Sequence, residues 1–272
     1  MPELPEVETI RRGLNEHLPG LSIEEIEVFF PGILKNESPD NFRLRLLRDC
    51  FVQVDRKGKY LLLYLASDQV IVIHLRMTGN LYYTTPNYPK EKHLHLLFIL
   101  DSKEELRFVD QRKFGEVYLI LASQVQDFPP LKKLGLEPFN SSLSLYKFEE
   151  MLKNSKRPIK QFLLDQTKIA GIGNIYADEA LFLAKVMPTR KADSLSREEI
   201  RRLFRAIREV LKKSIKAQGR TFSNYRNARG EAGDYQPLVH DRERKFCPFC
   251  GTPIEYTRVS QRGTFFCPKC QK

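Results

Sequence analysis

The sequence predicts a multidomain α+β protein, in which an N-terminal helix and an antiparallel β-sandwich precede a helical domain and a β-hairpin zinc finger. Three observations predict this fold class. Runs rich in β-branched and aromatic residues fill residues 51–121, helical periodicity begins near residue 145, and two C-x-x-C pairs lie within residues 247–270. With 272 residues and 42% hydrophobic content, the chain can form one large domain or two ordinary ones with packed cores.

The first element is a helix that begins near Pro5, within the opening MPELPEVE. Proline suits the first turn of a helix because the N–H that it lacks would have no partner there. Glu6 and Glu8 favour the positive end of the helix dipole. Apolar residues recur at steps of three and four positions, at Val7, Ile10, Leu14 and Leu18. This pattern explains the helix but leaves Pro2 and Glu3, which precede it, without a structural reason.

Six short strands follow, each bounded by turn residues. They are FVQVDR (51–56), YLLLYLA (60–66), VIVIHLR (70–76), HLHLLFIL (93–100), ELRFVD (105–110) and EVYLIL (116–121). Closely spaced strands of this kind predict an antiparallel sandwich or a flattened barrel.

The domain organisation follows from a change of pattern near residue 130. We assign residues 1–130 to the sandwich domain and 131–145 to a proline-containing linker. Residues 146–236 form the helical domain, and 237–272 the zinc-finger domain.

Within the helical domain, candidate helices are LYKFEEMLKNS, IKQFLLDQT and a segment that runs from Asn174 toward Val186. Ser196 and Glu199 form a capping-box pattern ahead of a long amphipathic helix that ends near Gly219. Residues 217–236 show no period and contain three glycines, which predicts a long loop of the kind that often serves as a lid.

The positive charge is concentrated in the back half of the chain. The formal net charge is +11, yet residues 1–150 hold 19 Lys and Arg against 22 Asp and Glu, whereas residues 151–230 hold 19 against 7. This asymmetry favours a polyanionic partner, although a solvated basic surface is the simpler alternative. No apolar run is long enough to span a membrane and the N-terminus lacks a signal-peptide pattern, so we expect a cytoplasmic location.

The two C-x-x-C pairs predict one structural zinc ion. Cys247 and Cys250 are separated from Cys267 and Cys270 by 16 residues, a spacing typical of tetrahedral four-cysteine zinc sites. Four thiolates leave no open position for catalysis, and redox activity is the less favoured alternative. The residues between the pairs alternate as in a β-hairpin, and we place Arg262 and Gly263 at its tip. Arg262 is then either a solvated turn residue or a phosphate contact.

Other segments carry residue types that contact nucleic acid. In AGIGNIY, Gly171 and Gly173 precede a helix at Asn174, where backbone N–H groups can approach a phosphate, although a plain helical corner also needs glycines. The inter-strand turns RKGK and DQRKFG are rich in cations, and Lys57, Arg112 and Lys113 are candidates to hold phosphates or base edges.

Two apolar residues occupy turns that should be hydrated. Phe114 either folds back into the core or acts as a wedge between bases, and Met77 in RMTGN has the same two interpretations. His93 and His95 fall on one strand face, where packing or hydrogen bonding is the simpler role because no third metal ligand is evident.

Taken together, these motifs resemble the formamidopyrimidine-DNA glycosylases, a family of bifunctional base-excision repair enzymes. The resemblance covers the whole chain and rests on the following segments: MPELPEVET at the start, HLRM at 74–77, QRKFG at 111–115, DQTKIAGIGNIYADE at 165–179, and C-x2-C-x16-C-x2-C with RGT inside it. It implies a helix–two-turn–helix domain beside the zinc finger, with duplex DNA in the cleft between the domains.

The resemblance explains the opening residues. Removal of Met1 would leave Pro2 with a free secondary amine, and α-amino groups have pKa values of about 8, so a neutral fraction exists at pH 7. That amine would attack the sugar, displace the damaged base and form an iminium ion, after which β- and δ-elimination cut the strand. Glu3 would shuttle protons, and Glu6 would orient the terminus. The resemblance adds Lys57 to the expected catalytic set, and it implies that Lys57 would also contact the phosphate beside the lesion.

The remaining expected DNA contacts are also carried over by resemblance. Lys160 would lie near the damaged nucleotide, Asn174 and Arg262 would clamp phosphates, and His93 is placed with these contacts. Met77, Arg112 and Phe114 would fill the gap that the extruded base leaves, with Arg112 reading the cytosine opposite. Residues 217–236 would form the lid over the lesion, with 220–225 nearest to the base.

The expected partner is double-stranded DNA with an oxidised base, bound by a monomer that is associated with the bacterial nucleoid. The favoured lesions are 8-oxoguanine and formamidopyrimidines. Thr78, Gln111 and the HDRERKF segment depart from the family pattern, which affects lesion preference rather than the reaction. Two alternatives are a related enzyme that prefers oxidised pyrimidines and a zinc-ribbon protein that binds nucleic acid without catalysis.

Overall fold

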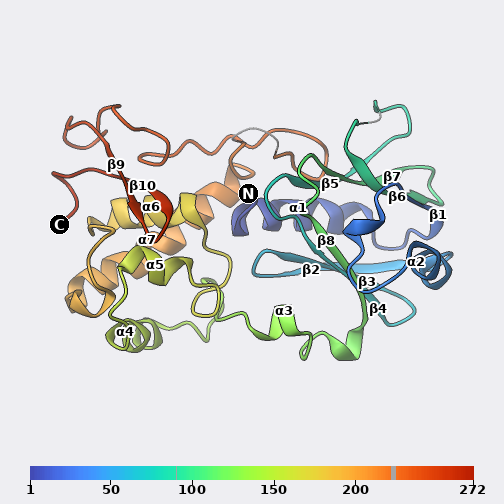
Figure 1. Cartoon of the computed structure of the whole chain (residues 1–272), viewed down its shortest axis with the longest axis horizontal. Coiled ribbons are helices and arrows are strands. Elements are labelled where there is room, and N and C mark those ends of the chain that lie inside the picture. Colours follow the sequence, from blue (N-terminus) through green and yellow to red (C-terminus); the bar gives the residue numbers. More distant parts are fainter. Residues whose placement is uncertain (90, 222–224) are drawn as a thin grey trace. The chain divides into compact units, whose positions relative to one another are not determined.

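The computed structural model describes residues 1–89, 91–221 and 225–272 (Figure 1). Contacts divide the chain into two compact units. Unit 1 joins Met1–Lys132 to Ile215–Tyr235, and unit 2 joins Lys133–Ser214 to Gln236–Lys272. Within the described ranges, no helix has the length and apolar character that a membrane span requires.

Unit 1 is a helix and a β-sandwich, which confirms the predicted fold of the front half. Helix α1 (Leu4–His17) is followed by strands that form two antiparallel four-stranded sheets within the described residues. One sheet has the order β1 (Ile23–Val28), β6 (Leu94–Leu100), β7 (Glu105–Asp110) and β5 (Gly79–Thr84). The other has the order β2 (Phe51–Lys57), β3 (Tyr60–Leu65), β4 (Gln69–His74) and β8 (Glu116–Leu121).

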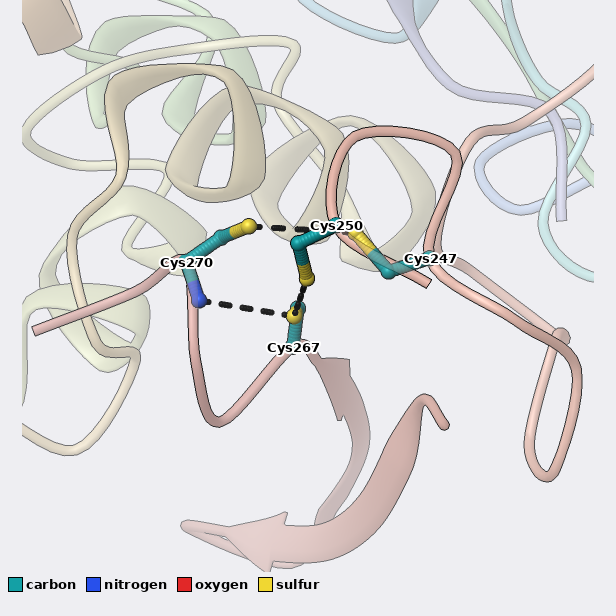
Figure 2. Close-up of side chains that lie close together, drawn as sticks. All are labelled: Cys247, Cys250, Cys267 and Cys270. Carbon is teal, nitrogen blue, oxygen red and sulfur yellow. Dashed lines mark hydrogen bonds between the residues drawn. The ribbon is translucent and has the colours of Figure 1, made fainter. Parts of the chain in front are cut away.

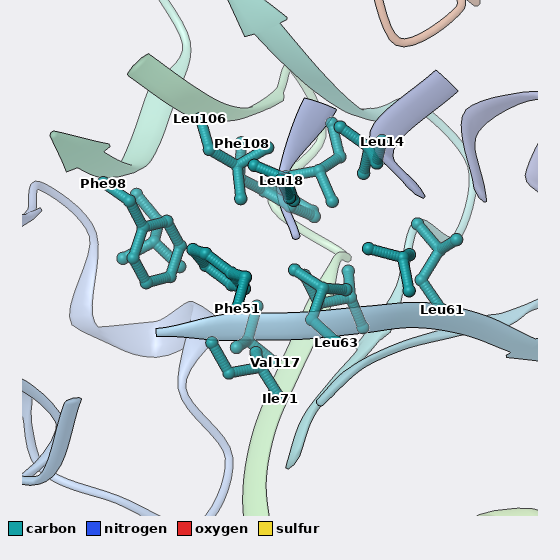
Figure 3. Close-up of a cluster of buried hydrophobic side chains, with 14 of the residues drawn as sticks. Leu14, Leu18, Phe51, Leu61, Leu63, Ile71, Phe98, Leu106, Phe108 and Val117 are labelled. Carbon is teal, nitrogen blue, oxygen red and sulfur yellow. The ribbon is translucent and has the colours of Figure 1, made fainter. Parts of the chain in front are cut away.

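The core of unit 1 lies between α1 and the two sheets. Figure 3 shows side chains from the helix and from both sheets pointing into one cluster. Its members include Leu14, Leu18, Phe51, Leu63, Phe98 and Phe108, each fully buried. Burying an aliphatic or aromatic side chain contributes about 1.5–3 kcal/mol, so this cluster fixes the helix on the sandwich.

Three elements of unit 1, two strands and a helix, were not predicted from the sequence. Strand β1 contains three glutamates and lies at the edge of its sheet, with a register shift between Ile23 and Glu25. Only two of its residues are buried. Strand β5 begins at Gly79, inside what the sequence suggests is a turn. Helix α2 (Pro39–Leu46) is short and begins at Ser38, whose hydroxyl accepts a hydrogen bond from the Asn41 N–H.

A short helix crosses the start of the predicted linker, residues 131–145. Helix α3 (Pro129–Lys132) belongs to unit 1 and precedes the chain's entry into unit 2.

Unit 2 is helical and carries a β-hairpin, as predicted. Its helices are α4 (Leu145–Lys153), α5 (Ile159–Leu164), α6 (Asn174–Ala184) and α7 (Arg197–Lys216), and its hairpin strands are β9 (Glu255–Val259) and β10 (Arg262–Phe266). The capping box ahead of α7 is confirmed. The Ser196 N–H donates to Glu199 Oε2 at 2.8 Å, and the Glu199 N–H donates to Ser196 Oγ at 3.3 Å.

The predicted tip of the hairpin is wrong by two residues. The turn is formed by Ser260 and Gln261, both with positive φ, and Arg262 already pairs with Val259 as the first residue of β10. A two-residue turn with positive φ at both positions matches the twist of the strands, and here serine and glutamine adopt it although glycine suits it better. Gly263, which drew the prediction, lies within the strand.

The segment after α7 belongs to unit 1 by its contacts, whereas the sequence analysis assigns it to the helical domain. Residues 215–235 contact unit 1, because the Tyr83 N–H donates to the Ala228 carbonyl at 2.8 Å and the Arg226 N–H donates to Asn80 Oδ1 at 2.9 Å. The sequence places this segment in the helical domain because it continues directly from α7. The domain boundaries themselves stay predictions.

Candidate active site and metal centre

The N-terminal residues form a buried corner ahead of α1. Pro2, Glu3 and Glu6 are all buried, and Glu3 is the residue immediately before the helix. The Glu3 N–H donates to Glu6 Oε2 at 2.9 Å. The other oxygen of this carboxylate, Oε1, accepts from the Arg220 N–H at 2.9 Å. Glu6 therefore joins the start of α1 to the segment that returns after α7.

Gly219 is required at this corner. Its φ is +82°, and an added Cβ would lie 2.9 Å from Glu6 Oε1. The Tyr225 hydroxyl donates to the Gln218 carbonyl at 3.0 Å, and burial together with the nearby Glu6 charge raises the pKa of Tyr225 well above its ordinary value. The predicted lid thus begins against Glu6, while residues 222–224 of the predicted contact segment lie outside the described residues.

Lys57, the fourth residue of the predicted catalytic set, is the last residue of β2. It is half-buried and pairs with Tyr60 across the β2–β3 turn. The neighbouring Arg56 reaches back to α1, where its Nε lies 3.1 Å from Glu8 Oε2. Burial alone would raise the pKa of Glu8, but hydrogen bonds from Arg11, Arg12 and Arg56 outweigh it and lower that pKa to about 2. The sequence analysis missed this charge cluster.

The two turns that carry Met77, Arg112 and Phe114 lie side by side in unit 1. Gly79, the first residue of β5, pairs with Asp110, the last residue of β7, so β5 starts beside the end of β7. Asp110 is fully buried and accepts hydrogen bonds from Thr78 Oγ1, from the Gly115 N–H at 2.7 Å and from the Arg112 N–H at 3.2 Å. One carboxylate therefore organises both turns.

The side chains at these turns are presented outward. Phe114 is 50% exposed and Met77 is 41% exposed, so neither folds back into the core. The Arg112 guanidinium lies 4.7 Å from the centre of the Phe114 ring, which is a cation–π arrangement. Two exposed apolar side chains and a stacked arginine at one edge of the sandwich provide a surface that can pack against bases.

His93 lies at a pocket of about 600 Å³ in unit 1. The pocket is also lined by Thr78, Gln111 and Arg226. The His93 carbonyl accepts from the Asp110 N–H at 3.0 Å, whereas His95 is buried and its Nε2 lies 2.7 Å from the Asp110 carbonyl oxygen. The two histidines therefore differ in role, since only His93 reaches the pocket.

In unit 2, Lys160 and Asn174 meet at the zinc hairpin. Lys160 Nζ donates to the Gly263 carbonyl at 2.7 Å and to Thr264 Oγ1 at 2.8 Å, and Asn174 Nδ2 donates to the same Gly263 carbonyl at 3.0 Å. Lys160 has no exposed surface and pairs with Asp178 at 2.6 Å. A side chain that contacts a nucleotide must be accessible to it, and the buried Lys160 side chain is not exposed in this structure.

Arg262 is exposed and directly precedes Gly263, so three of the predicted DNA-binding residues come together around one carbonyl group. Two acidic residues of this region, Asp178 and Glu179, were not predicted from the sequence. Both are fully buried on α6, and Asp178 is the partner of Lys160. Two adjacent acids in the apolar segment NIYADEALFLA were the available signal, because buried acids need specific partners.

The four paired cysteines form the predicted metal centre (Figure 2). Their sulfur atoms all lie within 4.8 Å of one another, with Cys247 Sγ 3.8 Å from Cys270 Sγ and Cys250 Sγ 3.5 Å from Cys267 Sγ. Four thiolates about 2.3 Å from a tetrahedral zinc ion would be separated by about 3.8 Å, so this set fits one structural Zn²⁺. Cys50 is not part of the cluster.

Three family models match the chain in succession. Residues 1–117 match the formamidopyrimidine-DNA glycosylase N-terminal domain, and residues 134–226 match the H2TH domain of the same family. Residues 244–272 match a zinc finger found in FPG and IleRS.

Relatives and solved structures agree with these matches. A formamidopyrimidine-DNA glycosylase from Desulforamulus reducens is 42% identical over 275 residues, which cover 100% of this chain and 99% of the relative. The Lactococcus lactis Fpg, solved in complex with DNA that contains an abasic site, is 37% identical with a TM-score of 0.92, covering 99% of each chain. MutM, solved in complex with DNA that contains carbocyclic 8-oxo-G, is 37% identical with a TM-score of 0.92, covering 100% of each chain.

Proposed function

Because the chain belongs to the formamidopyrimidine-DNA glycosylase family, we propose that it excises oxidised purines from DNA and then cuts the strand, with Pro2 as the nucleophile. Its substrates are 8-oxoguanine and formamidopyrimidine lesions opposite cytosine. Met1 precedes Pro2 in the sequence, and its removal would convert the Pro2 nitrogen from an amide into a secondary amine.

The reaction begins when the Pro2 nitrogen attacks C1′ of the damaged nucleotide. The bond between C1′ and the base breaks, and the base leaves with the electron pair and takes up a proton. Opening of the sugar ring gives an iminium ion between Pro2 and C1′. Loss of a C2′ proton expels the 3′ phosphate, and a second elimination expels the 5′ phosphate.

Glu3 is the proton shuttle of this scheme. It is buried next to Pro2, where a carboxyl group can protonate the ring oxygen of the sugar and later accept protons. Glu6 acts as a positioning residue, since its two oxygens hold the Glu3 and Arg220 N–H groups.

DNA is held by groups from both units. In unit 1, Lys57 and His93 contact phosphates, while Met77, Arg112 and Phe114 occupy the space that the extruded base leaves. In unit 2, Asn174 and Arg262 clamp a phosphate. The four-cysteine zinc site supports the hairpin that carries Arg262 and takes no part in the chemistry. We place the protein, as a monomer, in the cytoplasm with the bacterial nucleoid.

One observation carries the proposal. A proline and a buried carboxylate occupy the two positions ahead of α1, where Glu3 is the N-cap and forms a capping box with Glu6. A helix cap accounts for Glu3 and Glu6 but not for Pro2, and the proposed role as nucleophile accounts for Pro2.

A cutting assay tests the proposal. A duplex with one 8-oxoguanine opposite cytosine should be cut at the lesion, and an undamaged duplex should not. Glu3→Gln should lower the single-turnover excision rate by about 10²-fold or more, the range expected for a general acid–base group, and leave DNA affinity unchanged. Glu24→Gln, an exposed glutamate of β1 that pairs with Lys103, is the matched control.

Three results would count against it. Full activity in Glu3→Gln would remove Glu3 from the mechanism. Cutting confined to duplexes with oxidised pyrimidines would identify the other substrate class. Binding without any cutting, once Met1 is shown to be absent, would favour the nucleic-acid-binding alternative.

A further inference from the structure

Unit 2 contains a buried polar cluster that the proposed chemistry does not use. Its members are Lys160 on α5, Asp178 and Glu179 on α6, and His240 ahead of the zinc hairpin. The first three have no exposed surface and His240 is 7% exposed. Removing charged groups from water costs several kcal/mol for each ion unless partners compensate, so the geometry of such a cluster is closely determined by its pairings.

His240 begins a chain of contacts. Its Nδ1 lies 2.7 Å from Asp178 Oδ2, and because a carboxylate oxygen only accepts, Nδ1 carries the proton and donates. The Phe265 N–H donates to the same oxygen at 3.3 Å. Asp178 Oδ1 pairs with Lys160 Nζ at 2.6 Å. His240 thereby sets the plane of the Asp178 carboxylate, which in turn holds the Lys160 ammonium group.

The chain ends at the residues proposed to grip DNA. Lys160 Nζ and Asn174 Nδ2 both donate to the Gly263 carbonyl, and Arg262 directly precedes that residue. Asn174 Oδ1 is buried without a hydrogen-bond partner in the described part of the chain. Phosphate oxygens only accept, so the useful groups of Asn174 are its second Nδ2 hydrogen and its backbone N–H. The Gly263 carbonyl orients the side-chain amide that carries the first of these.

The backbone at His240 is fixed independently of its ring. The Glu179 carboxylate accepts three consecutive N–H groups, from Leu238, Val239 and His240, at 2.7, 2.8 and 2.9 Å. The His240 ring also packs edge-on against Phe265, with the ring centres 5.0 Å apart. Substitution of the ring therefore removes one donor without releasing the segment from α6.

We infer that His240 is a positioning residue for the phosphate clamp: through Asp178, Lys160 and the Gly263 carbonyl it holds Asn174 and Arg262 in one arrangement. The position belongs to the HDRERKF segment, which precedes the first zinc cysteine. The inference rests on the proposed function, because it takes Asn174 and Arg262 as DNA contacts.

Two substitutions separate positioning from packing. His240→Phe keeps a ring against Phe265 and removes the donor, whereas His240→Asn removes the ring and keeps an N–H where Nδ1 stands. Ser214→Ala is the matched control, because it deletes another buried hydrogen bond of unit 2, to Tyr176 at 2.6 Å, that is not part of the chain from His240 to Gly263. Each full-length protein is assayed for zinc content, Kd for the lesion duplex, and the single-turnover rate at saturating enzyme.

We expect His240→Phe to bind DNA about tenfold more weakly, equivalent to about 1.4 kcal/mol, with zinc content and the saturated rate unchanged. His240→Asn should recover most of this affinity, and Ser214→Ala should bind like the wild type. Equal affinity in His240→Phe and wild type would overturn the inference. Equal weakening in both His240 variants, or loss of zinc, would show a role in packing only. A wild-type protein that neither binds nor cuts the duplex would instead overturn the proposed function.

Discussion

The contact between Glu6 and Gly219 shows how one residue pair makes the candidate site possible. Glu6 uses both carboxylate oxygens on backbone N–H groups, at Glu3 and at Arg220. Glycine suits residue 219 beside this second bond, because an added Cβ would lie 2.9 Å from Glu6 Oε1 and the residue adopts a positive φ. Neither requirement can be read from the sequence, since 213 positions separate Glu6 from Gly219, and a glycine near the end of a helix usually indicates no more than a C-cap.

Gly219→Ala should therefore damage both stability and activity. An alanine at positive φ costs about 1–2 kcal/mol, and overpacking against Glu6 adds about 1–3 kcal/mol. Gly20→Ala is the control, because Gly20 also has a positive φ of +91° but an added Cβ meets nothing within 4 Å. Chemical denaturation and lesion cutting should show a larger loss of both properties for Gly219→Ala. Similar losses for the two variants would contradict the importance of the Glu6 contact.

The Glu8 cluster predicts a pH-dependent contribution to stability. The folded pKa of about 2 lies below the ordinary value of 4.5, so the carboxylate stabilises the fold fully above pH 4.5 and loses this effect as the pH falls toward 2. The contribution is roughly 3 kcal/mol, since one pKa unit corresponds to about 1.4 kcal/mol.

Unfolding measurements from pH 7 to pH 2 test this. Wild type and Glu8→Gln should differ most in unfolding free energy above pH 4.5 and converge as the pH approaches 2. Glu16→Gln, on the same helix and largely exposed, should differ from wild type by less than about 0.5 kcal/mol throughout. A difference between wild type and Glu8→Gln that does not depend on pH would refute the assignment.

At the scale of elements, hydrophobic pattern and turn residues predicted most of the fold. The six strands predicted between residues 51 and 121 and the capped helix α7 are present because their patterns are local. Strand β1 and helix α2 escaped because both are short and polar and take their place from contacts with other elements. The hairpin tip was misplaced because Gly263 suggested a turn, whereas its carbonyl instead receives Lys160 and Asn174.

The zinc hairpin depends for its folding on one feature, the four-cysteine metal site. Strands β9 and β10 are five residues each, and a hairpin of this size is marginal on its own in water. Cys247→Ser or a strong chelator should remove the metal, abolish the backbone NMR signals typical of the hairpin, and weaken DNA binding more than about tenfold. Cys50→Ser should retain zinc and affinity, because Cys50 is outside the cluster. A metal-free protein with an intact hairpin would contradict this dependence.

At the scale of the whole molecule, the sequence predicted the parts better than their connections. The cysteine spacing predicted the metal centre, and MPELPEVET together with the turn motifs identified the family. The links that hold these parts, such as Glu6 with Arg220, Arg56 with Glu8, and Lys160 with Asp178, join positions far apart in the chain. A pattern read along one chain has no signal for such pairs, so they appear only once the fold is known.

The same scale decides the central claim, because the proposed DNA contacts come from both units while the proposed bond to DNA forms at one atom. Borohydride added during the reaction with an 8-oxoguanine duplex should reduce the iminium ion to a stable protein–DNA adduct. Peptide mass spectrometry should then locate the DNA on Pro2. Attachment to a lysine such as Lys57, or no adduct from a protein that lacks Met1 and still cuts the duplex, would contradict the account.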